Sequence, residues 1–214
     1  GKPKQLGTLA QYTLVEEHLV APKPTNLSFE EAAGLPLAVL TAQQAFDIAK
    51  FEKGQSVFIV GGAGGVGSLA IQLAKHVYGA SRIVSTASTG KLDFVKSLGA
   101  DVVIDYTKQS YDQISEKFDF VFDTVGESSK SHVVAKEEAK VLDIASFQPI
   151  PRVEFFLVTP SAHNLEKLQP YIESEKLKPV IDPKSPFSFS DVIEAFKHQE
   201  SGRAKGKIVI SPID

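Results

Sequence analysis

The chain has 214 residues, of which 43% are hydrophobic and 23% charged, a composition typical of a globular protein with one sizeable core. Its net charge is −3 and like charges form no long run, so neither a nucleic-acid-binding groove nor attachment to an anionic membrane is expected. No apolar stretch approaches the roughly 18–20 residues of a membrane span. Cysteine is absent, which excludes disulfides and a cysteine nucleophile. Methionine is absent even at position 1, so we expect a piece of a longer protein.

The first quarter of the chain predicts short strands followed by helices. Apolar and polar residues partly alternate over residues 8–20, which predicts one or two strands, and a rigid connector follows at 21–26. Ser28 and Glu31 match a capping box and predict a helix that begins at residue 28. We expect this helix to be interrupted at Pro36 and to resume through residues 37–50.

From residue 56 onward, strands and helices alternate. Strands are predicted at 56–60, 82–86, 101–105, 118–126, 140–146 and 155–160, with helices at 66–78, 90–99, near 109–116 and around 128–138. A helix at 161–177, broken or kinked at Pro170, a helix capped near Ser190 and a strand at 206–213 complete the chain. Continuous apolar strands that alternate with helices indicate a doubly wound parallel α/β sheet.

A glycine-rich loop lies between the predicted strand 56–60 and the helix that follows it. Gly62, Gly64 and Gly67 satisfy the pattern G-x-G-x-x-G. In that pattern the first glycine permits a tight turn, the second lets a pyrophosphate approach the backbone, and the third lets the helix pack close to the strand. The N-terminus of the helix then presents free N–H groups to the phosphates. A tight turn without a ligand is the alternative, but the strand-to-helix context favours dinucleotide binding.

The end of the second strand of this unit predicts which dinucleotide binds. An NAD site places an Asp or Glu there to hold the ribose 2′-hydroxyl. Here the segment is "STASTGK" and contains no acid until Asp93, but it offers Ser88, Thr89 and Lys91. Hydroxyl and ammonium groups suit a 2′-phosphate, which a carboxylate would repel. NADPH is therefore predicted, with an ordinary helix cap followed by a solvated lysine as the alternative.

Several segments that together cover nearly the whole chain carry a family resemblance. They are "GTLAQYTLVEE", "LSFEEAAGLPLAVLTAQQAF", "GGAGGVGSLAIQLAKHVYGAS", "STASTGKLDFVKSLGADVVIDYTK", "KFDFVFDTVGE", "LQPYIESEKLKPVIDPKSPFSFSDVIEAF" and "RAKGKIVISPI". The sequence resembles the zinc-free quinone-oxidoreductase branch of the medium-chain dehydrogenase/reductase superfamily. Within that branch it is most similar to the plant enone oxidoreductases, a group of 2-methylene-furan-3-one and alkenal reductases.

The resemblance implies a set of cofactor-binding residues. The pyrophosphate would contact Gly65 and Val66 beside the glycines above, and the 2′-phosphate would contact the segment from Ser88 to Lys91. The remaining positions follow the strands and the C-terminal segment. The full set is Thr41, Gly62, Gly64, Gly65, Val66, Gly67, Ser88, Thr89, Gly90, Lys91, Tyr106, Asp123, Val125, Gly126, Phe147 and Arg203. Three of these have ordinary alternatives: Tyr106 as a cap of the sheet edge, Thr41 as a helix-interior threonine and Arg203 as a surface charge.

The resemblance also implies a domain organisation. Residues 1–24 correspond to a remnant of a GroES-like catalytic domain, 25–200 to an NADPH-binding Rossmann domain, and 201–214 to a strand that returns to the catalytic domain. Most of the catalytic domain of the family is missing, so this piece is expected to lack half of its active site. The chain departs from the family at Glu138-Ala139, where relatives usually have Gly-Gly, and in the segment "IASFQPIPRVEFF".

The implied reaction is hydride transfer from NADPH to the carbon–carbon double bond of an α,β-unsaturated carbonyl. A one-electron quinone reductase of the same branch and a non-catalytic NADPH-binding module are the alternatives. No catalytic acid is identified, because His18, His76, His132, His163 and His198 are each expected on a solvated face. No metal site is predicted, since cysteine is absent and no two histidines have helical ligand spacing. The branch implies a homodimer. The cysteine-free composition fits the cytoplasm as the compartment, with the chloroplast stroma as the alternative.

Overall fold

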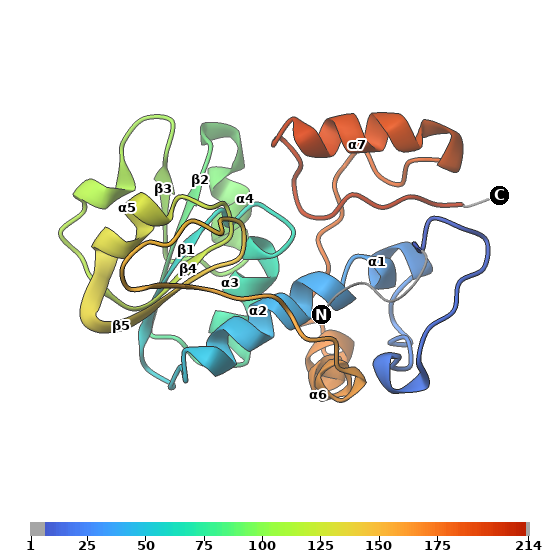
Figure 1. Ribbon diagram of the computed structural model, residues 1–214, viewed down its shortest axis with the longest axis horizontal. Coiled ribbons are helices and arrows are strands. Elements are labelled where there is room, and N and C mark those ends of the chain that lie inside the picture. Colours follow the sequence, from blue (N-terminus) through green and yellow to red (C-terminus); the bar gives the residue numbers. More distant parts are fainter. Residues whose placement is uncertain (1–6, 213–214) are drawn as a thin grey trace.

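The computed structural model describes residues 7–212 and contains a six-stranded parallel sheet with the order β3-β2-β1-β4-β5-β6 (Figure 1). The strands are β1 (Ser56–Val60), β2 (Arg82–Ala87), β3 (Val102–Asp105), β4 (Phe118–Asp123), β5 (Ala135–Asp143) and β6 (Val153–Phe155). The order reverses between β1 and β4, which lie side by side although β2 and β3 separate them in the chain. The predicted doubly wound Rossmann sheet is therefore confirmed.

Helices cover both faces of the sheet and continue to its right in Figure 1. The α-helices are α1 (Phe29–Ala33), α2 (Pro36–Ile48), α3 (Gly67–His76), α4 (Leu92–Ser97), α5 (Ser128–Ser131), α6 (Ala162–Glu173) and α7 (Val192–Glu200). Short 3-10 helices are η1 (Glu17–Leu19), η2 (Thr89–Lys91), η3 (Tyr111–Gln113), η4 (His132–Val134) and η5 (Phe189–Asp191). Within residues 7–212, none of these helices combines the length and apolar character needed to cross a bilayer.

Two apolar clusters, one on each face, hold the sheet between its helices. The larger cluster packs α2, α3 and α6 against Phe120 and Phe122 of β4. The smaller one includes Phe58, Phe118 and Tyr111 on the opposite face. The central strand β1 is buried on both sides from Val57 to Val60, as the continuous apolar run predicts for a parallel strand.

The local signals for the first helices are confirmed. The Ser28 hydroxyl accepts the N–H of Glu31, and the Glu31 carboxylate accepts the N–H of Ser28, so the capping box is complete. Pro36 is the first residue of α2, where its missing N–H and fixed φ cost nothing.

Two predictions within the sheet were wrong. Residues 135–138 belong to β5 and not to a helix, because Ala135 pairs with Phe118 through a register shift at the start of β4. The charged side chains of this part are exposed, and Lys136 forms an ion pair with Asp119 of β4. The structure places the end of β5 at Asp143. The sixth strand, predicted at 155–160, lies at Val153–Phe155.

The chain ends also differ from the prediction. The described residues 7–20 form no strand but only η1, and Tyr12 and Leu14 are 91% and 85% exposed because no strand lies beside them. The C-terminal segment forms isolated bridges from Gly206, Lys207 and Ile210 in place of a continuous strand. The predictions for residues 1–6 and 213–214 lie outside the described residues. The helix predicted at 161–177 is α6. It continues through Pro170 to Glu173, with Leu168 and Ile172 buried on one face.

Candidate functional site

A cleft of about 280 Å³ opens at the carboxyl ends of β1, β2 and β4, where the strand order reverses. This topological switch point is where open α/β sheets bind their ligands. Five predicted residues line the cleft: Gly64, Ser88, Lys91, Tyr106 and Val125. The other lining residues are Val60, Gly61, Ala63, Thr86, Ala87, Thr124, Glu127, Gly202 and Ala204. Gly202 and Ala204 flank the predicted residue Arg203 in the segment after α7.

The glycine loop forms the floor of the cleft, and its geometry corrects one residue role. The positive φ of +83° falls on Gly61, so the tight turn depends on Gly61 and not on Gly62. Gly62 is required for packing, since a Cβ there would collide with the Ser85 hydroxyl of β2. Gly67 has the predicted role, because a Cβ would collide with the carbonyl oxygen of Gly61 and separate α3 from β1.

Two further glycines of the same loop differ in the space beside them. A Cβ at Gly64 would meet only the Gly61 oxygen, at 3.4 Å, so the fold itself does not require glycine there. A Cβ at Gly65 would lie 2.8 Å from the flexible side chain of Lys207. α3 begins directly after Val66, and the first N–H groups of a helix have no partner within it. The loop therefore has the open backbone that a phosphate needs.

Lys91 stands at the opposite side of the cleft and contacts the C-terminal segment. Its Nζ donates hydrogen bonds to the carbonyl oxygens of Arg203 (2.9 Å) and Ala204 (2.8 Å). Burial lowers the pKa of Lys91, and this effect is partly opposed by the charge of Asp182. An ammonium group has three donors, so one N–H of Lys91 is left for a further acceptor. These two backbone contacts were not predicted from the sequence.

The hydroxyl of Thr89 is used within the protein. Thr89 Oγ1 donates to Asp105 Oδ2 at 2.6 Å, and Thr107 Oγ1 donates to the other oxygen of the same carboxylate, also at 2.6 Å. The bonds from Thr107 and Thr89 lower the pKa of Asp105. The segment 85–91 contains no acid, but Asp105 at the end of β3 lies behind it. Ser88 lines the cleft, while Gly90 has open space where a Cβ would stand.

The segment 203–207, named here the C-terminal strap, lies across the glycine loop. The N–H of Gly206 donates to the carbonyl oxygen of Ala63 at 2.8 Å, and Gly206 forms a bridge with Gly64. In Figure 1 the strap follows α7 and begins at the end of that helix nearest to α4. The Arg203 side chain does not line the cleft; it lines a separate cavity with Lys184, Lys197 and His198.

The loop after β4 is held by the predicted residue Asp123, but from inside the protein. Asp123 is fully buried, and its Oδ1 accepts the N–H groups of Val125 (2.9 Å) and Gly126 (2.8 Å). Burial raises the pKa of Asp123. The carboxylate therefore shapes the loop, while Val125, which is 55% exposed, is the residue that reaches the cleft. Gly126 has a φ of +92°, which requires glycine at this turn.

Thr41 and Phe147 are further predicted residues that do not line the cleft. Thr41 is buried within α2, and its hydroxyl donates to the carbonyl oxygen of Leu37 at 2.6 Å. This contact matches the ordinary helix-interior alternative. Phe147 is 76% exposed and packs on Phe155 with ring centroids 4.1 Å apart.

The histidines provide no catalytic acid at this site, since none of the five lines the cleft. The prediction that all of them are solvated is wrong for His198. Its side chain is 12% exposed, and its Nε2 lies 3.1 Å from Asp182 Oδ1. Within residues 7–212, no three His, Cys, Asp or Glu side chains gather as a metal-binding group.

Comparison with known proteins identifies relatives along the whole chain. Residues 98–210 match the family model described as zinc-binding dehydrogenase. The chain is 56% identical to a 2-methylene-furan-3-one reductase of Solanum lycopersicum and 52% identical to a chloroplastic NADPH-dependent alkenal/one oxidoreductase of Arabidopsis thaliana. Each match covers 99% of this chain but 54% of the relative, so the chain spans about half the length of these curated relatives.

A solved structure supports the same assignment of the fold. The quinone oxidoreductase of Coxiella burnetii superposes with a TM-score of 0.80 at 33% identity, over 89% of this chain and 63% of that one. The resemblance to enone and quinone oxidoreductases is thereby confirmed. The family description mentions zinc, but the residues here do not fit a zinc site, because cysteine is absent and the described residues form no group of three ligands.

Proposed function

The chain belongs to the zinc-binding dehydrogenase family, and from this premise we propose that it binds NADPH in the cleft and forms the cofactor-binding half of an enone reductase. One observation carries the proposal: Gly64 of the glycine loop, where the fold leaves room for a Cβ, lines a cleft that Ser88, Lys91 and Tyr106 also line. The loop suits the pyrophosphate, and the hydroxyl and ammonium groups suit the adenosine side. The predicted binding residues keep these roles as part of the proposal.

NADPH is favoured over NADH by the charges at the cleft. Lys91 can still donate one hydrogen bond, and Lys207, whose pKa burial lowers, packs its stem against Gly65. Asp105 lies behind the segment 88–91, and its oxygens already accept hydrogen bonds from Thr89 and Thr107. Glu127 lines the cleft on the side of β4, where it accepts a hydrogen bond from the Tyr111 hydroxyl. The Arabidopsis relative is named as NADPH-dependent, which supports the same choice.

We propose the reduction of the carbon–carbon double bond of α,β-unsaturated carbonyls as the reaction. Bound NADPH supplies the hydride, and the protein positions the cofactor and excludes water. The names of both plant relatives support this substrate class, while the Coxiella neighbour favours a quinone as the second candidate. A non-catalytic NADPH-binding module is the third candidate. We assign no proton donor, since no histidine lines the cleft.

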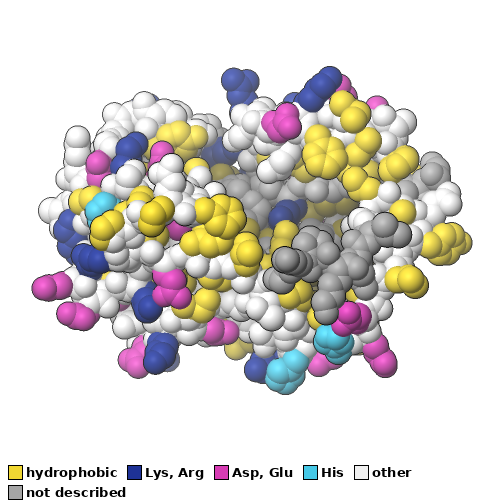
Figure 2. All heavy atoms as spheres, viewed as in Figure 1, with side chains coloured by type: hydrophobic (Ala, Val, Ile, Leu, Met, Phe, Trp, Pro, Cys, Tyr) yellow, Lys and Arg dark blue, Asp and Glu magenta, His cyan; other side chains and the backbone are white. Residues whose placement is uncertain are grey.

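We propose that residues 1–24 and 201–214 are parts of a GroES-like catalytic domain. Bridges from Ile181 to Lys207 and from Phe187 to Ile210 join the C-terminal segment to the residues before α7. Hydrophobic side chains gather on the α7 side of Figure 2, where Ile193 and Phe196 are 62% and 53% exposed. Such a surface suits contact with further protein. A homodimer and residence in the chloroplast complete the proposal, since the Arabidopsis relative is named as chloroplastic, with the cytoplasm as the alternative.

Titration of the chain with NADPH and NADH tests the cofactor assignment. Lys91→Ala should reduce the preference for NADPH over NADH by about 1.5–3 kcal/mol, the usual contribution of a charge-assisted hydrogen bond. The ratio of the two affinities isolates the 2′-phosphate contact, since loss of the strap contacts affects both cofactors. Lys96→Ala, on the exposed side of α4, is the matched control. Equal wild-type affinities for the two cofactors would refute the assignment.

Turnover of the complete protein tests the reaction. NADPH oxidation is measured with methyl vinyl ketone and, separately, with a quinone. Consumption with the enone supports the leading proposal, and consumption with the quinone alone supports the second candidate. Binding of NADPH without consumption of either substrate would support the third candidate, the non-catalytic NADPH-binding module.

A further inference from the structure

The C-terminal strap forms part of the cleft wall although it lies far from the glycine loop in the sequence. Ala204 of the strap lines the cleft beside Gly202, and Gly206 donates its N–H to Ala63 in the loop. The position of the strap therefore sets the width of the cleft on the side of Lys91 and Ser88. A residue that fixes the strap can influence binding without touching the ligand.

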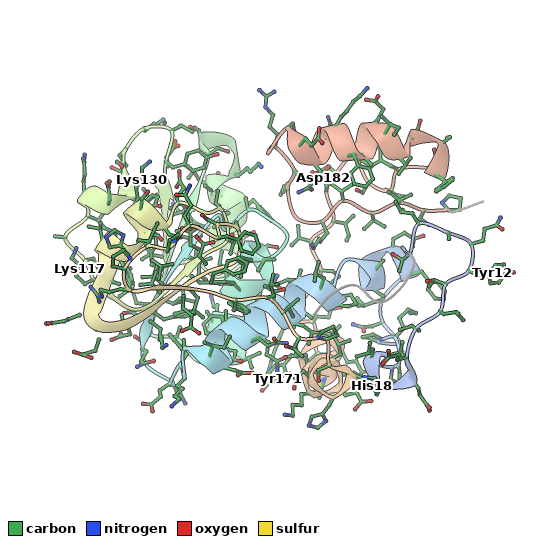
Figure 3. The ribbon with its side chains drawn as sticks, in the orientation of Figure 1. Tyr12, His18, Lys117, Lys130, Tyr171 and Asp182 are labelled. Carbon is green, nitrogen blue, oxygen red and sulfur yellow. The ribbon has the colours of Figure 1, made fainter. Side chains whose placement is uncertain are left out.

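Asp182 contacts the strap twice from the side opposite to the cleft. Its Oδ2 accepts the N–H of Lys205 at 2.7 Å, and its own N–H donates to the carbonyl oxygen of Lys207 at 2.8 Å. Figure 3 shows Asp182 between α7 and the C-terminal segment. The residue is 3% exposed and lines neither the cleft nor its glycine loop.

Neighbouring groups keep this buried side chain charged. Burial disfavours the carboxylate, but the N–H groups of Lys205 and Lys184 and the side chain of His198 outweigh it and lower the pKa of Asp182. The Lys184 N–H lies 2.9 Å from Oδ1, and His198 Nε2 lies 3.1 Å from the same oxygen. A buried carboxylate with this many donors holds its neighbours in one geometry.

Lys91 holds the strap from the cleft side, through the carbonyl oxygens of Arg203 and Ala204. The strap is thus bonded to a cation that faces the cleft and to an anion behind it. In addition, Lys205 Nζ lies 4.0 Å from the ring centroid of Phe94 in α4. Both faces of the strap are therefore occupied by charge-assisted contacts.

We propose that Asp182 is a positioning residue for the adenosine half of the cofactor site, and that it acts through the strap. This inference rests on the proposed binding of NADPH. Asp182→Asn replaces one acceptor oxygen by an NH₂ group. Whichever way the amide is turned, either the N–H of Lys205 or that of Lys184 then faces a donor, and the strap loses its fixed place. A purely structural role would lower the melting temperature and leave the affinity of the folded protein unchanged.

The test compares NADPH and 2′,5′-ADP, a ligand that contains only the adenosine half with its phosphates. Asp182→Asn should weaken both ligands by the same factor, about tenfold, and trypsin should cleave the strap after Arg203 or Lys205 faster than in the wild type. Asp101→Asn is the control for loss of a backbone acceptor alone, because the exposed Asp101 accepts the N–H of Ile83 at 2.7 Å and does not contact the strap. Unchanged affinity of Asp182→Asn, or weakening of NADPH alone, would overturn the inference.

Hydrogen exchange on the wild-type chain keeps the proposal testable if Asp182→Asn does not fold. Because binding and strap position are linked, 2′,5′-ADP should slow exchange of the backbone N–H groups of Lys205 and Lys207. Equal exchange with and without the ligand would contradict the inference. A wild-type chain that binds neither NADPH nor 2′,5′-ADP would instead refute the proposed function, and this inference with it.

Discussion

The two halves of the carboxyl edge of the sheet hold their loops in different ways. After β4 and β5, the last residue of each strand holds the loop that follows: Asp123 and Asp143 are fully buried, and each accepts two backbone N–H groups of its own loop. After β1 and β2, glycines shape the first loop, and Lys91 of the second contacts Arg203, 112 positions further along the chain.

This difference predicts how far the structural effect of a substitution extends from the substituted loop. A loop held by its own aspartate depends on short-range bonds, so a change there alters stability and leaves the opposite half in place. The cleft is lined by the loops after β1, β2, β3 and β4 and by the C-terminal segment, but within residues 7–212 only the loops after β1 and β2 are bonded to that segment. A change in one of these bonded segments can therefore displace the others, whereas a change at Asp123 or Asp143 acts first on the stability of its own loop.

The largest effect is expected from Gly67→Ala in the glycine loop. The new Cβ would collide with the carbonyl oxygen of Gly61, which is backbone and cannot rotate away, so we expect a loss of about 3 kcal/mol of unfolding free energy. Gly64→Ala is the matched control, since its Cβ meets only the Gly61 oxygen at 3.4 Å. Urea denaturation measures both. Equal stability of the two variants would show that α3 does not need its close approach to β1.

In the other half, the two aspartates are expected to respond oppositely. Asp143→Ala removes the acceptor for the N–H groups of Ala145 and Ser146 and for the hydroxyl of Ser128, and should cost about 2–3 kcal/mol. Asp123→Asn keeps an acceptor for its loop and removes a charge whose pKa is raised by burial.

The sign of the Asp123 effect follows from that raised pKa. The charged form is disfavoured in the fold, so stability falls as the pH rises from the unfolded pKa of this carboxyl to its raised folded pKa, and stays at the lower level above it. Asp123→Asn should therefore be neutral or stabilising at pH 7, and its gain should shrink as the pH falls below the folded pKa and be lost below the unfolded pKa. Thermal unfolding at several pH values measures this, and a loss like that of Asp143→Ala at pH 7 would contradict the interpretation.

The sequence predicted the parts of this comparison that local geometry determines. The alternation of apolar strands and helices predicted the parallel sheet. Ser28 and Glu31 predicted the start of α1, and the spacing of Gly67 predicted the close approach of α3 to β1. In each case the physical requirement lies within a few residues of the signal. The family resemblance adds the predicted cofactor-binding residues, five of which line the cleft.

Long-range contacts could not be predicted in the same way. Nothing in the local sequence shows that Lys91 bonds the carbonyl oxygens of Arg203 and Ala204, or that Asp182 faces Lys205 and His198. The resemblance implied a cofactor-side role for Asp123, but its carboxylate is buried and accepts the N–H groups of its own loop. Residues 8–20 alternate like a strand, yet in the described part of the chain no strand lies beside them.

A smaller effect of pH is expected at the amino end of β4, away from both halves. Burial disfavours the Asp119 carboxylate, but bonds from Lys136 (2.6 Å) and from the N–H of Ser56 (2.9 Å) outweigh it and lower its pKa from 3.8 to about 2. A depressed pKa means that stability is present above about pH 4 and is lost as the pH falls toward 2. The loss should be about 1–2 kcal/mol, since the side chain is 24% exposed.

Urea denaturation of wild type and Asp119→Asn between pH 2 and 6 measures this contribution. The variant should be less stable than the wild type at pH 6 and equal to it near pH 2. A constant difference across this range would show that the carboxylate does not titrate with a depressed pKa. Ligand affinity at pH 6 should be unchanged, because Asp119 lies at the opposite edge of the sheet from the cleft.

The smallest effect on stability is expected from Gly90→Ala in η2, the turn between β2 and α4. A Cβ there meets no atom within 4 Å and the φ of Gly90 is not positive, so the variant should gain about 0.4–1 kcal/mol from the reduced entropy of its unfolded chain. The space that this Cβ enters is the space proposed for the 2′-phosphate, between Thr89 and Lys91. Affinity for NADPH should therefore fall while affinity for NADH changes little. If the variant is more stable and binds both cofactors as the wild type does, the 2′-phosphate does not lie between Thr89 and Lys91. The proposed cofactor contacts in this half would then be those of the strap and the glycine loop.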